Sequence, residues 1–143
     1  MLQPGSKNQN QKTTLGKGLL LFIISILLFV ITCPLGFIYG IFYLLFKHGI
    51  TKIGSYFLEI AIAIDQLGNV IMQHLLNTLW VKKEGYAFGN RDETISSAIG
   101  KNKQQGTLTS FGMFIDKTLD FIDPNHSLNS IDYDIEPIKS TLN

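Results

Sequence analysis

The residues best suited to chemistry lie in the second half of the chain, where carboxylates and a histidine are close together in the sequence. The candidates are Asp92, Glu93, Asp120, Asp123 and His126. Asp120 and Asp123 are spaced to share one face of a helix, and His126 follows just beyond. Such groups are the raw material of a metal site or of a general acid–base pair.

The spacing of these groups argues against a complete metal or catalytic site. A closed zinc site needs about four ligands, and the chain has neither His-x-x-x-His nor paired cysteines. Ser96 and Ser97 lack the glycine elbow of a hydrolase nucleophile, and no phosphate-binding glycine loop is present. We therefore expect no enzymatic activity, no cofactor and no bound metal. The weak metal candidates are Asp120, Asp123 and His126.

An uncharged apolar run of 28 residues, 19–46, precedes these groups and must leave water. As a helix it would be about 42 Å long, against a hydrocarbon core of roughly 30 Å, so one tilted or kinked span is enough. Pro34 splits the run into pieces shorter than the ~17 residues that one span needs, which disfavours a hairpin and predicts a kink. Gly36 and Gly40 leave room for another helix to approach.

Two other interpretations of this run are weaker. A secretory signal would have a shorter apolar stretch, followed by a cleavage site with small residues. The sequence has neither feature. Lipidation at Cys33 is disfavoured because Thr32 precedes it and Pro34 follows. Cys33 is the only cysteine, so an intramolecular disulfide is impossible, and its default role is packing.

The segment 1–18 is polar and too poor in apolar residues to build a core, which predicts a flexible arm. Lysines lie on both sides of the apolar run, so the positive-inside rule only slightly favours a cytoplasmic N-terminus. The formal net charge is +1, which disfavours nucleic-acid binding. The basic segment 81–106 and the acidic end from residue 107 could pair within a molecule or between molecules.

Segment 47–81 predicts an amphipathic helix along the membrane surface or in a bundle. Its apolar stripe consists of Phe57, Ile60, Ile64, Leu67, Ile71, Leu75 and Leu79, and polar residues, mostly amides, follow the other side. A second membrane span is the competing interpretation, but Glu59, Asp65 and the amides would be costly in lipid. Trp80, Lys82 and Lys83 suit an interface anchor, although Trp80 suits an ordinary packed aromatic equally well.

Segment 82–131 predicts a small helical domain, followed by an acidic tail at 132–143. Asn90 or Asp92 would cap its first helix, Gly106 would end it, and Thr107 or Thr109 would cap the next. In that next helix the expected buried face is Phe111, Phe114, Ile115, Leu119 and Ile122, and the expected wet face is Asp116, Lys117 and Asp120. No sustained alternation indicates a strand, so the fold class is all-α.

Two strings resemble a pattern in small uncharacterised proteins of bacteriophages and prophages. They are Gly-Asn-Arg-Asp-Glu-Thr-Ile-Ser-Ser-Ala-Ile-Gly-Lys (89–101) and Leu-Asp-Phe-Ile-Asp-Pro-Asn-His-Ser-Leu-Asn-Ser-Ile (119–131). The motif positions are Asp92, Glu93, Thr94, Ser96, Ser97, Asp123 and His126. Cysteine most often follows the histidine in those proteins, whereas Ser127 stands here. The resemblance implies a viral setting rather than an activity.

The expected function is that of a non-enzymatic, single-pass structural protein in a virion internal membrane or the host inner membrane. Its expected partners are the lipid bilayer, viral capsid or membrane proteins, and further copies of itself. One alternative is a holin-like lysis protein, in which the amide-bearing helix would be a second, pore-lining span. Another is a membrane-tethered enzyme that uses His126 and its neighbouring aspartates.

Overall fold

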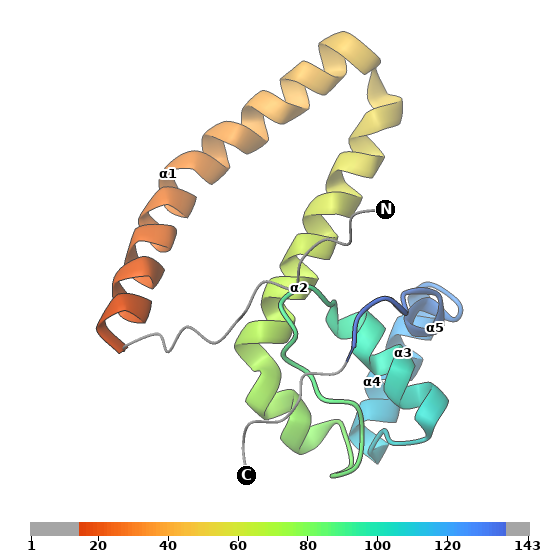
Figure 1. Cartoon of the computed structure of the whole chain (residues 1–143). Helices are drawn as coiled ribbons and strands as arrows, with labels where there is room; N and C mark the ends of the chain where they lie inside the picture. Colours follow the sequence, from red (N-terminus) through yellow and green to blue (C-terminus); the bar gives the residue numbers. More distant parts are fainter. Residues whose placement is uncertain (1–14, 137–143) are drawn as a thin grey trace, which may run out of the picture. The chain divides into compact units, whose positions relative to one another are not determined.

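The structure, a computed structural model, describes residues 15–136 of the 143-residue chain. Its helices are α1 (Leu15–His48), the 3-10 turn η1 (Ile50–Lys52), α2 (Ile53–Leu79), α3 (Ile95–Gln105), α4 (Ser110–Ile122) and α5 (His126–Asn129) (Figure 1). No strand forms in this part of the chain, where Val81 and Leu108 make an isolated antiparallel bridge. The predicted all-α class is confirmed. The chain divides into unit one, Met1–Ile53, and unit two, Gly54–Asn143.

α1 provides most of the described part of unit one, and none of its residues is buried. Ser25 and Thr32 each donate a hydrogen bond to the carbonyl four residues earlier, at 2.8 and 2.7 Å. These bonds satisfy the two hydroxyl donors within the helix, so neither hydroxyl needs a partner outside it. By length and composition, α1 and the segment Ile50–Leu79 are both able to cross a membrane.

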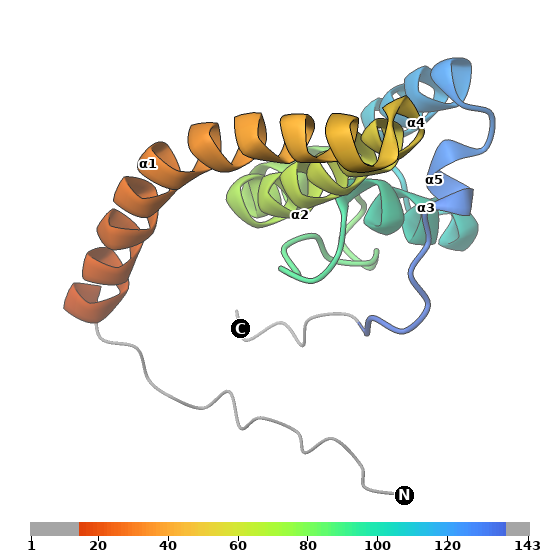
Figure 2. The ribbon, with the colours of Figure 1, turned by 90° about the horizontal axis from the view of Figure 1, so that it is seen from above.

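α1 is longer than the predicted span of 19–46, since it begins at Leu15 and ends at His48. Residues 15–18 of the predicted arm are therefore helical, and the remainder of the arm lies outside the described residues. Extending a helix by one turn costs far less than starting one, which explains the longer element. Pro34 lies inside α1 without ending it, and the ribbon of α1 bends along its length (Figure 2).

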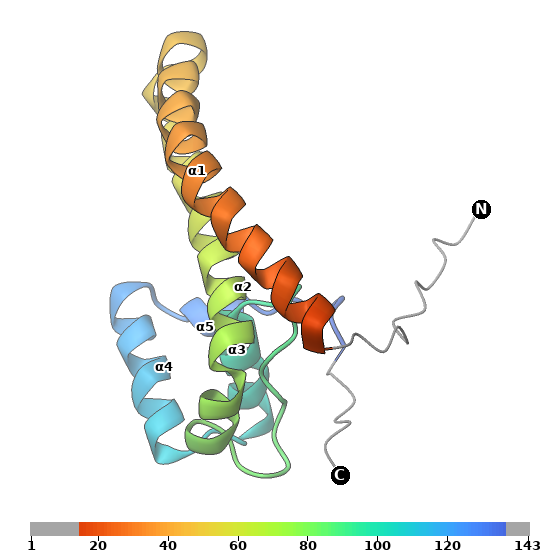
Figure 3. The ribbon, with the colours of Figure 1, turned by 90° about the vertical axis from the view of Figure 1, so that its left-hand side faces the viewer.

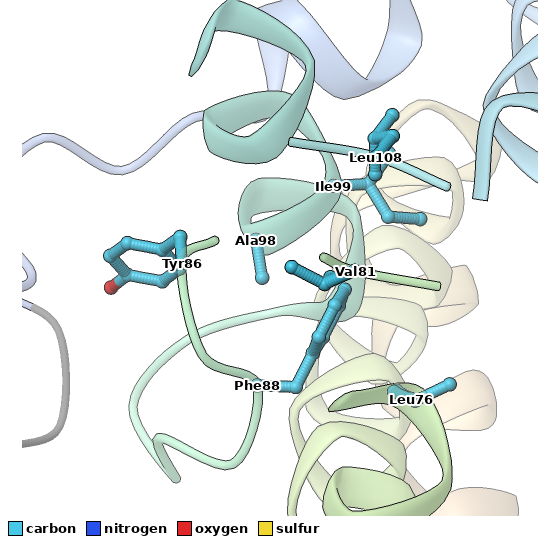
Figure 4. Packing of buried hydrophobic residues seen from close by; sticks show 7 residues of the cluster. All are labelled: Leu76, Val81, Tyr86, Phe88, Ala98, Ile99 and Leu108. Carbon is cyan, nitrogen blue, oxygen red and sulfur yellow. The ribbon is translucent and has the colours of Figure 1, made fainter. Parts of the chain in front are cut away.

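The apolar core of unit two is small and lies between α2, α3 and the segment that joins them. Its buried members are Leu76, Val81, Tyr86, Phe88, Ala98, Ile99 and Leu108 (Figure 4). Trp80, Ile95, Ile115 and Leu119 are partly buried against this cluster. A core of this size supplies little stability, so polar contacts must fix much of the unit.

The helix ends of unit two follow the sequence in part. Gly106 ends α3 in the left-handed conformation with φ of 68°, and Thr109 caps α4 by accepting a bond from the Gly112 amide at 3.1 Å, as predicted. The prediction that Asn90 or Asp92 caps the first helix is wrong, because Thr94 caps α3. Asn90 and Asp92 belong to a loop that is bound to α2, so the helix starts only after that loop ends.

The prediction for the faces of α4 is largely wrong. Phe111, Phe114 and Ile122 are exposed, with 62% and 78% of the surface of the last two accessible, whereas Asp116 is 4% exposed. Gly112 explains the rotation, because a Cβ at this position would collide with the Trp80 carbonyl, so this side of α4 must face the end of α2. Only Ile115 and Leu119 of the expected face pack against the core.

α5 joins α3 and α4 into one group, and it lies between them in Figure 3. The contact with α3 is at Gly100, where a Cβ would meet the backbone of Ser127. The Ser127 hydroxyl donates to the buried Asp116 carboxylate of α4. A glycine and a satisfied carboxylate thus bring α3, α4 and α5 together where larger apolar residues would not fit.

Candidate functional site

The amide side chains of α2 bind the backbone of the loop formed by residues 85–94. Asn69, which is fully buried, donates to the carbonyls of Asn90 and Glu93 at 3.0 and 2.8 Å and accepts from the Gly89 amide at 2.9 Å. This loop has no regular structure of its own, so its backbone groups need such partners. We call this set of contacts between polar residues of α2 and the segment 85–96 the amide clamp.

The amide clamp continues along α2 on both sides of Asn69. Asn77 donates to the Phe88 carbonyl at 2.9 Å and accepts from the Phe88 amide at 2.8 Å. Gln66 donates to the Asp92 carbonyl at 3.1 Å. These amides of α2 therefore bind the chain's own loop, which follows α2 in the sequence.

Asp65 extends the clamp to the start of α3. Its carboxylate accepts from the backbone amides of Ile95 and Ser96 at 3.2 and 3.3 Å and from the Ser96 hydroxyl at 2.8 Å. A carboxylate at a helix N-terminus accepts hydrogen bonds from otherwise unpaired backbone amides and interacts favourably with the helix dipole. Ser96 is therefore held as a helix-start residue.

Glu93 of the motif is buried with a full set of partners. Its carboxylate pairs with the Lys101 ammonium at 2.6 Å and accepts from the hydroxyls of Tyr86 and Ser97, both at 2.7 Å. Ser97 also accepts from the Asp132 amide at 3.0 Å. A buried ion pair is tolerated only when hydrogen bonds complete it, as they do here. Glu93 and Ser97 thus connect α3 to the loop and to the start of the acidic tail.

The three predicted metal candidates do not come together at one point: Asp123 and His126 pair, but Asp120 binds elsewhere. Asp120 binds the Lys103 ammonium at 2.7 Å, and Asp123 lies 2.9 Å from Nδ1 of His126. Among residues 15–136, no group of three or more His, Cys, Asp or Glu side chains could hold a metal ion. Lys103 also binds Asp116 at 2.8 Å, so the predicted pairing of basic and acidic segments occurs within unit two.

Five of the seven motif residues nevertheless line one cavity of about 370 Å³ in unit two. Its lining includes Asp92, Glu93, Thr94, Ser96 and His126, together with Asp65, Asp132 and three apolar residues of α2, namely Leu58, Ala61 and Ile62. Most of the polar groups on its wall are committed to the contacts described above. The histidine pairs with Asp123 rather than with a serine, so the described contacts contain no nucleophile–base pair.

The residues predicted to face membrane or partners have mixed outcomes. Trp80 is half-buried and meets the rings of Phe88 and Phe111 edge-on at centroid distances of 6.2 and 6.3 Å, so it is a packed aromatic. Lys82 donates to the Gly106 carbonyl at 2.8 Å, and Lys83 is exposed. In α1, a Cβ at Gly36 would have no atom of residues 15–136 within 4 Å, and Gly40 is half-buried.

Sequence reasoning missed the buried hydrogen bonds and ion pair that are made by Asn69, Tyr86, Lys101 and Asn102. Asn102 is fully buried, donates to the carbonyls of Tyr86 and Ala98 at 2.9 Å, and accepts from the Tyr86 amide at 2.9 Å. The available signal was the row of amides on one side of α2, directly before a glycine-containing loop. Such a row predicts partners for backbone groups, but it does not identify them.

Comparisons with protein-family models, with curated proteins and with solved structures found no match for this chain.

Substitution of Asn69 tests the amide clamp. Asn69→Ala leaves buried backbone groups of the loop without partners, and we expect unit two to lose about 2–4 kcal/mol of unfolding free energy. Thr78→Ala is the matched control, because the exposed Thr78 hydroxyl donates to the His74 carbonyl of its own helix and not to the loop. Urea unfolding of the full chain in detergent, followed by emission of Trp80, the only tryptophan, measures both. Equal losses in the two variants would contradict the clamp.

Alkaline pH tests the polar core. Burial and the hydrogen bond to Glu93 raise the pKa of Tyr86 above its ordinary value of 10.0. Burial lowers the pKa of Lys103, but hydrogen bonds to Asp116 and Asp120 outweigh that effect and raise it above 10.5. Both groups are more easily deprotonated when unfolded, so they stabilise the fold below pH 10 and lose this contribution as the pH rises through their folded pKa values.

We therefore expect the urea midpoint of unit two to fall as the pH rises above about 10, the reference pKa of tyrosine. Tyr86→Phe removes one of the two groups and should make the fall shallower. Midpoints for both proteins between neutral pH and pH 11 provide the test. An identical alkaline slope in Tyr86→Phe would refute the assignment of this dependence to Tyr86.

Proposed function

We propose that this chain is a non-enzymatic protein anchored in a membrane by α1, and that unit two links the bilayer to other proteins. The observation that carries the proposal is α1 itself, an apolar helix of 34 residues with no buried residue. At 1.5 Å per residue it is about 51 Å long, which exceeds the hydrocarbon core of roughly 30 Å. Water is a poor environment for so long a run of exposed apolar side chains.

The end of α1 carries features of a membrane interface. The Lys47 ammonium donates to the Tyr43 hydroxyl at 2.7 Å, four residues earlier. Tyrosine and lysine side chains are enriched at the headgroup level, where an apolar body and a polar tip are both accommodated. This pair supports placing the C-terminal end of α1 at a membrane surface.

A single span is the topology that the amide clamp favours. Residues 65–77 of α2 bind the loop, whose Arg91 and Asp92 side chains are more than two-thirds exposed. Carrying these charges into hydrocarbon would cost several kcal/mol. The longest continuous part of α2 outside the clamp is 53–64, and its twelve residues reach about 18 Å, too short for a span. We therefore propose that α1 alone crosses the membrane.

We propose that the chain is not an enzyme because the side chains of the motif residues are already bound to partners within the fold. Glu93, Thr94, Ser96 and Ser97 each complete a helix start or a buried ion pair. Side chains engaged in this way hold a fold together and leave no evident nucleophile. The candidate base His126 is paired with Asp123 at the surface.

The viral setting is proposed from the sequence pattern at 89–101 and 119–131, which resembles phage and prophage proteins. In that setting the chain would be a structural component of a virion internal membrane or of the host envelope. Its proposed partners are other viral proteins and further copies of itself. A holin-like lysis protein is the main rival, and it requires α2 to be a second span.

Topology separates these two functions. In a Cys33→Ser background, single cysteines at Lys17, Ser55 and Lys83 mark the start of α1 and the two ends of α2. We expect a membrane-impermeant maleimide, applied to intact and opened vesicles, to place positions 55 and 83 on one side and position 17 on the other. Finding positions 55 and 83 on opposite sides would refute the single span and favour the lysis function.

The viral structural role has its own test, which is mass spectrometry of purified virus particles after detergent extraction. We expect this chain in many copies in the lipid-containing fraction. If it were instead absent from particles and present only in the host membrane late in infection, the structural role would fail.

A further inference from the structure

The amphipathic helix α2 is inverted relative to a helix on the surface of a water-soluble domain. Its polar side is turned inward, where Asn69 and its neighbours bind the loop, and its apolar stripe faces outward. The outward stripe includes Ile64, Leu67, Ile71, Leu75 and Leu79, and Ile64 and Ile71 are 63% and 70% exposed. An exposed apolar row of this length on a helix marks an interaction surface.

α4 also has an outward apolar face, because the residues that it turns inward are not its large apolar ones. Gly112 and Asp116 face the interior, so Phe111, Phe114, Phe121 and Ile122 remain exposed. The Phe111 ring contacts Trp80 at the end of α2 and stacks on Phe114 with a centroid distance of 6.4 Å. Through these rings the apolar surface of α4 begins where α2 ends, within unit two.

We infer that the outward faces of α2 and α4 bind the surface of the bilayer in which α1 is anchored. The inference rests on the proposed function, because α1 supplies the attachment. In this arrangement α2 lies in the membrane plane with its apolar stripe at the boundary of headgroups and acyl chains. The amide clamp keeps its polar side covered by the loop, so neither side of the helix is left in an unfavourable environment.

The covalent connection is the first reason to choose lipid as the occupant. His48 ends α1 and Ile53 begins α2. Five residues of chain reach at most roughly 18 Å, even when fully extended. A bilayer that holds α1 is therefore always within reach of α2, at a high effective concentration, whereas a second copy must first be found by diffusion.

Charge is the second reason. Lys52 precedes α2, and Lys82 and Lys83 follow it, so basic side chains stand at both ends of the apolar stripe. Basic residues near an anionic lipid surface each strengthen binding modestly. Glu59 lies on the opposite side of α2 from the apolar stripe, and Glu84 comes after the two lysines. The acidic groups therefore do not interrupt the stripe.

Collision measurements on spin-labelled full-length protein in vesicles with anionic lipid test the inference. Single cysteines replace Ile71 on the apolar stripe, Phe114 on α4 and Glu59 on the opposite side of α2, all in the Cys33→Ser background. Oxygen concentrates in lipid, and a nickel chelate stays in water. We expect the ratio of oxygen to nickel collisions at positions 71 and 114 to exceed that at position 59 severalfold.

Variants that place charges on the apolar faces should weaken binding to the bilayer. Ile71→Lys combined with Phe114→Lys should lower the ratio at a label on Leu67, while Gln105→Lys, an exposed site at the end of α3, should leave it unchanged. An unchanged urea midpoint in each variant verifies that unit two is still folded.

Three results would overturn the inference. Nickel reaching position 71 as freely as position 59, in protein that resists alkaline extraction, would refute docking and leave the α1 anchor intact. Exclusion of both reagents from position 71 would mean that protein, either α1 or a second copy, covers the stripe. Release of the protein by alkaline extraction would overturn the anchor and the docking together.

Discussion

The hydrogen bonds of Asn69 are the interaction on which the rest of unit two depends. The loop after α2 has no regular structure, and its backbone groups at Gly89, Asn90 and Glu93 are satisfied by this one buried side chain. The apolar core is small and buries Tyr86 and Phe88 of the loop, but it provides no partners for the loop's backbone groups. Once the loop is fixed, Glu93 is placed to pair with Lys101, and α3 starts where Thr94 and Asp65 can cap it.

The same interaction determines what unit two presents to its surroundings. A helix has one apolar and one polar side, and the amide clamp uses the polar side to bind the loop. The apolar side of α2 then faces outward. In α4, Gly112 and Asp116 face the interior, so the large apolar side chains face outward there too. An apolar surface that covers these faces would remove their side chains from water. In the proposed arrangement that surface is the bilayer that holds α1.

The sequence predicts the elements better than their contacts. The run 19–46 identified α1, and Gly106 and Thr109 marked real helix ends, because these signals are local. The stripes of α2 were also visible, but which of them faces inward depends on a loop more than ten residues away in the chain. The buried face of α4 was mispredicted, since a preference for burying Phe114 and Ile122 ignores the closeness that Gly112 requires. The candidate ligand Asp120 proved to be the partner of Lys103, a distant residue that no local rule selects.

Hydrogen exchange in the loop is the most direct test of this account. The full chain in lipid nanodiscs, and its Asn69→Ala variant, would be compared by the exchange rates of backbone amides in residues 85–94. The amide clamp predicts that the Phe88 and Gly89 amides exchange slowly, although they lie outside any helix, and that the Gly89 amide loses its protection when Asn69 is replaced. Exchange of these amides at the rate of an unstructured peptide in the unaltered chain would contradict it.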